Sequence, residues 1–379
     1  MLTRKRQLAS KIEAVEGSAE TLTIAEAKTL AINPKITHDV KMFQRNPARS
    51  TLGNLGEIPG QRYGKITFGI ELRGSGTATT APDWGKHIKS SGAKENVLKA
   101  MTIGAITNGP FVHGETITGG TSTATGRVIL TTVNGTTNLY LVSLTGSFQS
   151  GETITGSISG ATATTASTAT AVGMVYEPET NPPSQTMASY EDGISKVLKG
   201  CRGTFKINFK IGEVPVVDFD FSGAEGGVAA ASLFTNPSYE ATKPPAFLSA
   251  NLTIDGVSLK LADLTIDAGT TLAPVDSPGD PSGISHFVIG QRMVNGSFTA
   301  RMELPTTHDF FNKWFSGTFM ILDTSWGTVS GNKFRFYAPK IQYTKNDDAD
   351  QGGLAAVKST FSVNESATPG DDGWALLCL

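Results

Sequence analysis

The sequence has few cysteines, no long apolar run and no excess of positive charge, and each shortage excludes a class of protein. Cys201 and Cys378 are the only cysteines among 379 residues, too few for a disulfide scaffold or a cysteine zinc site, so we expect two reduced thiols. No stretch reaches the length of a membrane span, and the basic segment 1–10 is not followed by a secretory apolar run. The 32 basic and 34 acidic residues leave a net charge of −2, which excludes a global basic field for holding nucleic acid. We expect a soluble protein that is made in a cytosol and binds no membrane.

Glycine, threonine and short alternating apolar runs dominate what is present. The 42 glycines and the turns between these runs predict an all-β architecture with minor helices. A composition that is 39% hydrophobic and 17% charged supports a substantial core in two or three domains. One short helix is expected over residues 4–15, because Leu8, Ile12 and Val15 share a helical face. That helix would either reach a neighbouring subunit or pack against its own subunit.

Several apolar runs alternate with polar residues as half-buried antiparallel strands do. Phe68, Ile70 and Leu72 share one strand face, with polar neighbours on the other. The runs 205–211 and 217–221 repeat this pattern, and the four residues 212–215 between them are short enough for a hairpin connection.

A strand followed by a helical stretch occurs twice in the chain. Gly64–Leu72 precedes a helical stretch around Trp84, and Gly296–Leu304 precedes one around Trp314. Glycine, threonine, glutamate and leucine recur between the two strands at a constant offset of 232 residues. We interpret this as a duplicated β domain, although any two amphipathic strands would share the alternation, so chance similarity stays open. The helical stretches are expected to end near Ser91-Gly92 and Ser316-Gly317.

Residues 102–173 differ in composition and contain a second repeat. The sequence Gly-Glu-Thr-Ile-Thr-Gly occurs at 114–119 and again at 151–156, a shift of 37 residues. A flexible Gly/Thr linker is the alternative, but it would lack an apolar set such as Phe111, Ile117, Val128, Leu139, Leu141, Phe148 and Ile154. We predict a small folded β module that is inserted in a loop and projects from the surface.

Removing this module joins a helical stretch from Trp84 to Val97 to the segment that begins at Met174. The predicted organisation is a first, discontinuous β domain of residues 1–101 and 174–239, the inserted module 102–173, and a second, similar β domain 240–379.

Candidate chemical motifs are isolated. The pairs His38-Asp39 and His308-Asp309 have no further ligands at metal spacing, so structural or surface histidines are favoured over a metal site. Ser91-Gly92-Ala93-Lys94 lacks the companion elements of a serine hydrolase and is interpreted as a helix end. The acidic segment 347–352 lacks the distal glutamate of a calcium loop and is interpreted as a solvated hairpin tip. No set of acid, base, nucleophile and oxyanion donors is visible, so we expect neither an enzyme nor a cofactor.

Several segments resemble the tail tube proteins (major tail proteins) of long-tailed, non-contractile bacteriophages. The resemblance covers most of the chain outside residues 102–173, and the inserted module resembles Gly-Glu-Thr-Ile-Thr-Gly repeats of phage virion and tail-fibre proteins. The segments that carry it are Leu8–Gly17, Thr51–Gly53, Phe68–Gly76, Ala81–Trp84, Tyr190–Gly193 through Phe221–Gly223, and Gly331–Phe334 through Ala338–Pro339.

The resemblance implies a structural virion protein that assembles into stacked rings. Family members form rings of six β domains whose inner strands close a barrel, so a duplicated chain would need three copies, with a ring of six as the alternative. Expected partners are the protein itself and the tape measure, tail terminator and distal tail proteins, in a virion tail made in the host cytoplasm. DNA would pass without specific binding through a lumen that is polar and acidic with few fixed cations.

Asp218 and Asp220 lie on the polar face of an otherwise apolar strand and are the candidate lumen residues, with outer solvent-exposed positions as the alternative. Other functional alternatives are a decoration or other virion component, and a carbohydrate-binding surface protein.

Overall fold

The structure, a computed structural model, describes residues 5–132, 135, 137–366 and 370–379. It is mostly β with two short helices in the described part, which confirms the expected all-β fold with minor helices. The helices are α1 (Gly85–Ser90) and α2 (Phe310–Phe315). The strands are β1 (Arg6–Ile12), β2 (Ile32–Phe43), β3 (Ile58–Glu71), β4 (Ala93–Thr102), β5 (Thr116–Gly119), β6 (Thr125–Val128), β7 (Asn138–Thr145), β8 (Thr153–Gly156), β9 (Thr162–Thr164), β10 (Thr170–Pro178), β11 (Gln185–Glu191), β12 (Gly193–Lys210), β13 (Val216–Ala231), β14 (Asn251–Ile254), β15 (Val257–Ser258), β16 (Leu261–Asp267), β17 (Thr270–Asp276), β18 (Ile284–Arg292), β19 (Asn295–Arg301), β20 (Phe319–Trp326), β21 (Phe334–Asp350), β22 (Ala355–Val363) and β23 (Ala375–Cys378).

One antiparallel sheet runs through the body of the molecule in the order β2-β3-β13-β12-β16-β19-β22-β21. The predicted hairpin is confirmed as β12 and β13, in which Asn208 pairs with Val216. Phe68, Phe219 and Phe205 are buried on one face of this sheet, while the alternate residues of the same strands are polar. The sheet therefore has an apolar face toward the core and a polar face away from it.

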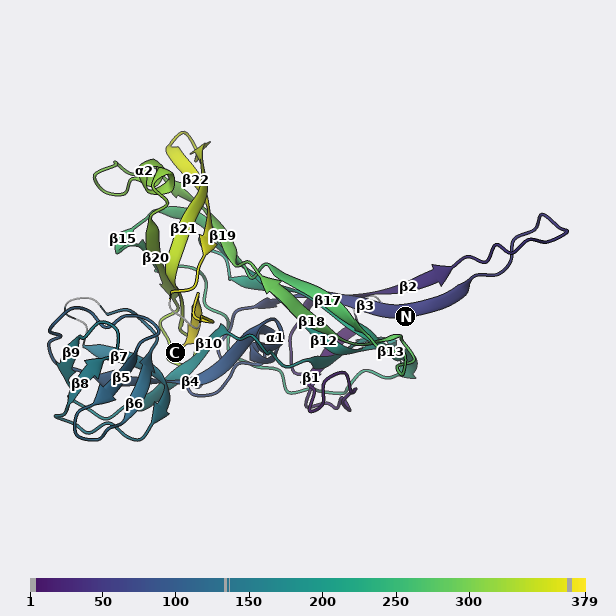
Figure 1. The fold of residues 1–379 in the computed structure, drawn as a ribbon, viewed down its shortest axis with the longest axis horizontal. Helices are drawn as coiled ribbons and strands as arrows, with labels where there is room; N and C mark the ends of the chain where they lie inside the picture. Colours follow the sequence, from purple (N-terminus) through teal and green to yellow (C-terminus); the bar gives the residue numbers. More distant parts are fainter. Residues whose placement is uncertain (1–4, 133–134, 136, 367–369) are drawn as a thin grey trace.

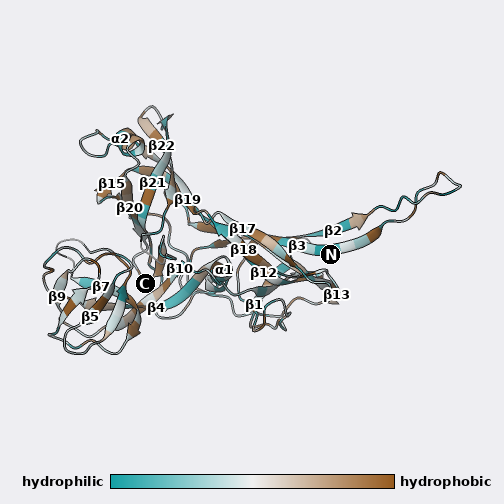
Figure 2. Cartoon of the chain, viewed as in Figure 1, coloured by the Kyte–Doolittle hydropathy of each residue, from teal (hydrophilic) through white to brown (hydrophobic). Residues whose placement is uncertain are grey.

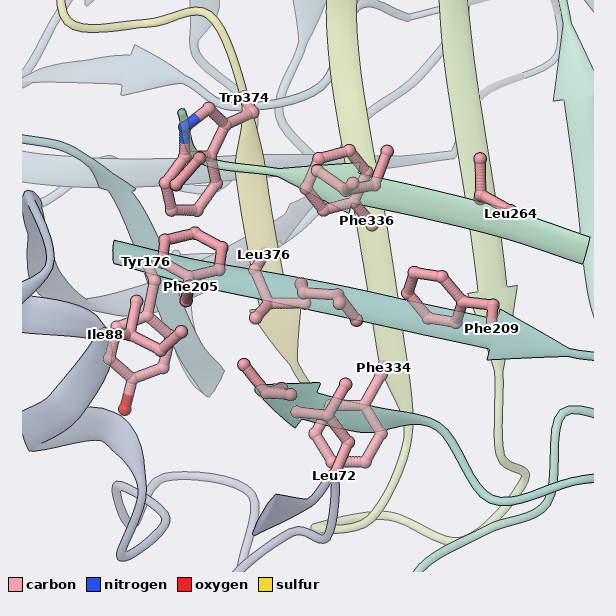
Figure 3. Close-up of a cluster of buried hydrophobic side chains, with 14 of the residues drawn as sticks. Leu72, Ile88, Tyr176, Phe205, Phe209, Leu264, Phe334, Phe336, Trp374 and Leu376 are labelled. Carbon is pink, nitrogen blue, oxygen red and sulfur yellow. The ribbon is translucent and has the colours of Figure 1, made fainter. Parts of the chain in front are cut away.

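A second layer covers the apolar face. Strands β4, β10, β23, β21, β20 and β14 pair in that order, and β1 pairs with β11, which pairs with β12. The side chains between the layers form one continuous core from both halves of the chain. Figure 3 shows this core, with Phe205 and Phe209 of β12 near Phe334 and Phe336 of β21 and near Trp374.

Helix α1 closes one end of this core. Trp84 precedes the helix, is almost fully buried, and donates from Nε1 to the Arg73 carbonyl at 2.8 Å. The helix ends at Ser90, and Ser91 Oγ donates to the His87 carbonyl at 2.8 Å, so the Ser91–Lys94 motif is a helix end as expected. Gly92, at φ 104°, adopts the left-handed conformation that stops the helix.

Two predictions of helix are wrong. Residues 6–12 of the segment 4–15 form strand β1, and residue 4 lies outside the described residues. Leu8, Ala9 and Ser10 are consecutive and all buried, because β1 is covered on both faces, and this removed the alternation typical of a half-buried strand. The helical stretch expected from Trp84 to Val97 gives way at Ala93 to strand β4.

Strands β5 to β9 lie together at one end of the molecule (Figure 1). β6, β5, β8 and β9 pair in that order, and β7 connects this group to β4. Their buried side chains form a separate cluster that includes Phe111, Ile117, Phe148 and Ile154. The strands β4 and β10, which lead into and out of this region, pair with each other.

At the opposite end of the longest axis, β2 and β3 extend far beyond the sheet and carry the long loop 44–57 between them (Figure 1). We call residues 40–62 the arm. Val40, Met42, Phe43, Leu52 and Ile58 of the arm are all exposed. Figure 2 shows apolar residues along the strands that lead to the loop.

Candidate assembly surfaces

The body sheet consists of two four-stranded units with the same strand order. We call β2, β3, β13 and β12 the first unit, and β16, β19, β22 and β21 the second unit. Gly64 pairs with His38 on one side and Gly223 on the other, and Gly296 pairs with Ile266 and Phe361 in the same way. The offset of 232 residues relates β3 to β19 alone, and each of these strands pairs with the corresponding neighbours of its own unit.

The tryptophans used to align the two helical stretches do not match. Trp84 precedes α1, whereas Trp314 lies in the last turn of α2. What the two helices share is their end, because Ser91 and Ser316 are both C-cap residues.

The two units join through β12 and β16. Lys206 pairs with Asp267 and Lys210 with Asp263 in this antiparallel junction, and Phe209 pairs with Leu264 between them. Opposite charges directly across a ladder stabilise it, and the buried apolar pair fixes its register. The last strand of the first unit thus accepts the first strand of the second.

The corresponding outer strands keep an open edge. In the described part of the chain, β2 pairs only with β3, and residues 344–350 of β21 pair only with β22. Trp314 Nε1 donates to the Thr344 carbonyl at 3.1 Å, which leaves Asp347–Asp350 as the part of β21 whose edge away from β22 is open. This end is acidic, whereas β2 carries two lysines, Lys35 and Lys41, and one aspartate, Asp39. Such open edges are templates for pairing with another strand.

Asp218 and Asp220 lie on the polar face of the body sheet. Asp218 is exposed and accepts a hydrogen bond from Asn208 Nδ2 at 2.8 Å. Burial raises the pKa of Asp220, and the nearby charge of Lys65 acts against this increase. A hollow of about 510 Å³ lies over this part of the face and is lined by both aspartates.

Basic side chains share this face. Lys206 lies between Asp218 of β13 and Asp267 of β16 in a cross-strand row, and Lys65 is on the neighbouring strand β3. The face is therefore mixed in charge and not predominantly acidic. The alternation of Lys206 with Phe205 and Ile207 in the sequence predicts this position, although the expected acidic lining did not take the lysine into account.

The two His-Asp pairs lie in different structural contexts. His38 Nδ1 lies 2.6 Å from Glu225 Oε2, and Asp39 accepts from the Tyr63 hydroxyl. His308 is buried with Nε2 2.8 Å from the Tyr343 hydroxyl, and Asp309 caps α2 by accepting from the Asn312 amide. Burial, the largest effect, lowers the pKa of His308 to about 4. In both pairs the histidine and the aspartate contact other residues of the same fold.

The acidic segment 347–352 belongs to β21 and its turn. Asp347 pairs with Lys345 Nζ at 2.6 Å, and Asp350 Oδ1 accepts from the Gly353 amide. Among the described residues, no group of three or more histidine, cysteine or acidic side chains is placed to hold a metal ion. Cys201 and Cys378 are free and buried. No helix in the described ranges is long and apolar enough to cross a membrane.

The sequence was also compared with known proteins. No curated protein matches it. The family described as phage tail tube protein matches residues 3–363, which is nearly the whole chain and includes both units and the region of β5 to β9. The chain therefore belongs to the phage tail tube protein family and is a structural component of the virion tail.

Proposed function

We propose that copies of this protein join edge to edge into rings, and that stacked rings form the tail tube through which DNA is ejected into the host. The observation that carries the proposal is the β12–β16 junction inside the chain. It supplies a template for joining two units, and each copy retains one open strand of each kind. The acidic end of β21 and the two lysines of β2 match in charge, as Lys206 and Asp267 do within the chain.

We further propose that three copies complete a ring with pseudo-sixfold symmetry. Each copy contributes two units, so the division predicted from the sequence, with residues 1–101 and 174–239 before the junction and 240–379 after it, becomes the repeating pattern of the ring. The module of residues 102–173 would project outward once per copy. Its own hydrophobic cluster supports a folded module, and Ile129, Leu130 and Val142 attach it to the body by packing in a second cluster with residues such as Tyr337 and Leu377.

The polar face of the sheet is proposed to line the bore, with Asp218 and Asp220 on its wall. DNA slides through a channel most easily when no fixed cation holds its phosphates. The placement of Lys206 between two aspartates supports this role, because neighbouring carboxylates balance its charge. Passage without specific binding therefore follows from charge balance instead of from the absence of cations.

Interactions with the tape measure, tail terminator and distal tail proteins, a non-contractile tail and synthesis in the host cytoplasm are proposed from family membership. The alternatives, a decoration protein or a carbohydrate-binding surface protein, give no reason for the tail tube family to match both body units.

Electron microscopy of the concentrated purified protein tests the proposal. Hollow rods or rings are expected, and reference-free class averages of isolated rings should show three outer projections. Six equivalent projections would rule out three copies while leaving the tube intact. A protein that remains monomeric at all concentrations would contradict self-assembly.

A further inference from the structure

The segment between β16 and β19 folds back onto the first unit of its own chain. This segment, 268–294, forms the hairpin β17–β18, and its side chains Ile284 and Phe287 are buried against Ala224 of β13. The Phe287 ring lies 6.0 Å from the ring of Tyr63.

Polar contacts fix the hairpin in this place. The Arg62 amide donates to the Ser282 carbonyl at 2.9 Å, and Lys199 forms an ion pair with Asp280. Arg202 Nη1 donates to the Phe287 carbonyl at 2.6 Å. The hairpin therefore covers the polar face of β3, β12 and β13 beyond the region that carries Asp218.

The arm occupies the corresponding place in the first unit. It connects β2 to β3 just as segment 268–294 connects β16 to β19, and the two segments have similar lengths. The tripeptide Gly-Gln-Arg occurs near the end of both segments, at 60–62 and at 290–292, two residues out of the register that aligns Gly64 with Gly296. The arm is thus the counterpart of the β17–β18 hairpin, but its tip extends away from its own body (Figure 1).

The second unit has an unfilled groove where the first unit holds the hairpin. Equivalent sheet positions place Asn295 where Tyr63 lies and Ser362 where Ala224 lies. Both residues line a groove of about 620 Å³, together with Met293, Val294, Val363 and Trp374. Met293 is 62% exposed, so the groove presents apolar surface to solvent.

We infer that the arm of a neighbouring copy of this chain lies in this groove. The inference rests on the proposed ring, because joining β21 of one copy to β2 of the next places the second unit of the first copy beside the arm of its neighbour. The contact repeats between copies what the β17–β18 hairpin does within one. Exposed apolar side chains on the arm, including Phe43 and Leu52, would replace Ile284 and Phe287 as the groups that cover the sheet.

Cross-linking between separately prepared variants tests this contact. Leu52→Cys or Phe43→Cys on the arm is mixed with Met293→Cys in the groove, assembled, and treated with a short bismaleimide. The native thiols at Cys201 and Cys378 are buried and serve as the background in the parent protein. Ile158→Cys on the exposed surface of the module is the matched control for the arm variants.

A covalent dimer between arm and groove variants is expected in isolated rings, and none with the Ile158 control. Rings whose arm cysteines do not react with the groove, or react only after rings stack into rods, would overturn the inference while leaving the proposed ring intact. Absence of rings, seen by sedimentation velocity, would contradict both. In addition, Ser362→Trp should fill the groove and raise the concentration needed for ring formation about 10-fold with an unchanged unfolding midpoint; unaltered assembly would count against the inference.

Discussion

In the region of β5 to β9, two copies of the sequence Gly-Glu-Thr-Ile-Thr-Gly hold each other reciprocally. Glu115 accepts hydrogen bonds from the amides of Ile158 and Ser159 at 3.1 and 3.0 Å, and Glu152 accepts from the amides of Thr121 and Ser122 at 3.1 and 2.9 Å. Each carboxylate is buried in the turn of the other copy. The two units of the body sheet, in contrast, join in a row, with one junction made and one edge of each kind left open.

The difference shows how duplication can either close a structure or extend it. Reciprocal contacts use the same surface on both copies, so two copies complete the set. Head-to-tail contacts use different surfaces, so every added unit presents a new open edge until a ring closes. The contacts between the two repeats in the region of β5 to β9 are complete within one chain, whereas the proposed ring would complete the body sheet with further chains.

Shortening the arm should have the largest effect of the changes considered, because it should weaken assembly of the body while leaving the module intact. Phe43 pairs with Ile58 across the arm, so an Asn-Gly turn can replace residues 44–57 without disturbing the strand register. We expect assembly to require at least about 100-fold more protein, because the exposed apolar tip is lost from the contact between copies. Sedimentation velocity measures this change.

Circular dichroism should show that the shortened protein retains its β structure. Ile158→Ser, at an exposed apolar site on the module, is the control and should assemble as the parent does. A shortened protein that forms rings at the parent concentration would remove the arm from the assembly scheme.

Phe287→Ala and Phe43→Ala compare the two counterpart segments within the isolated chain. Phe287 is 5% exposed, so its truncation should lower the free energy of unfolding by about 3–5 kcal/mol. Phe43 is 48% exposed, and its truncation should change that free energy by less than about 0.5 kcal/mol. Urea unfolding of the monomer measures both. Equal losses would mean that the arm packs on its own chain.

Glu152→Gln and Glu115→Gln should each destabilise the module by about 1.5–3 kcal/mol, because both carboxylates accept several amide hydrogen bonds. Hydrogen exchange at the amides of Thr121, Ser122 and Ser159 would report the loss. Exchange that speeds up in only one of the two turns when either glutamate is replaced would show that the copies are not coupled.

The pH dependence of the module follows from the same contacts. Burial raises the pKa of Glu152, but the hydrogen bonds from Ser122, Gln149 and Thr121 outweigh it and hold the pKa at about 2. Because this lies below the ordinary value of 4.5, the stabilisation is complete above about pH 4.5 and is lost as the pH falls toward 2. The Glu152→Gln protein should lack this part of the acid response.

Local alternation was sufficient to predict the half-buried strands and the β12–β13 hairpin, since Phe205, Ile207 and Phe209 mark a single buried face. It failed for β1, where Leu8, Ala9 and Ser10 are all buried: Leu8 belongs to the main core on one face and Ala9 to a second cluster with Ala27 on the other. The position of Asp220 on the polar face was predictable for the same reason as the hairpin. The groove beside Asn295 and Ser362 was not, because it exists only through pairings between strands far apart in the sequence.

The smallest change in stability is expected for a substitution on the polar face, at a position where the two units carry different charges. Asp220 pairs with Thr67 in the first unit, and Lys358 pairs with Thr299 at the matching place in the second. Burial raises the pKa of Asp220 above 3.8, so the ionised carboxylate destabilises the folded chain at neutral pH. Asp220→Asn should therefore stabilise the monomer at pH 7 by at most about 0.5 kcal/mol. The gain should vanish as the pH falls through the raised pKa, since the parent carboxyl is then neutral as well. Urea unfolding between pH 3.5 and pH 7 measures this trend, with the exposed Asp218→Asn as the control.

If Asp220→Asn instead loses stability at neutral pH, the negative charge at this position is stabilised within the chain, and the two units differ in their electrostatics as well as in their contacts.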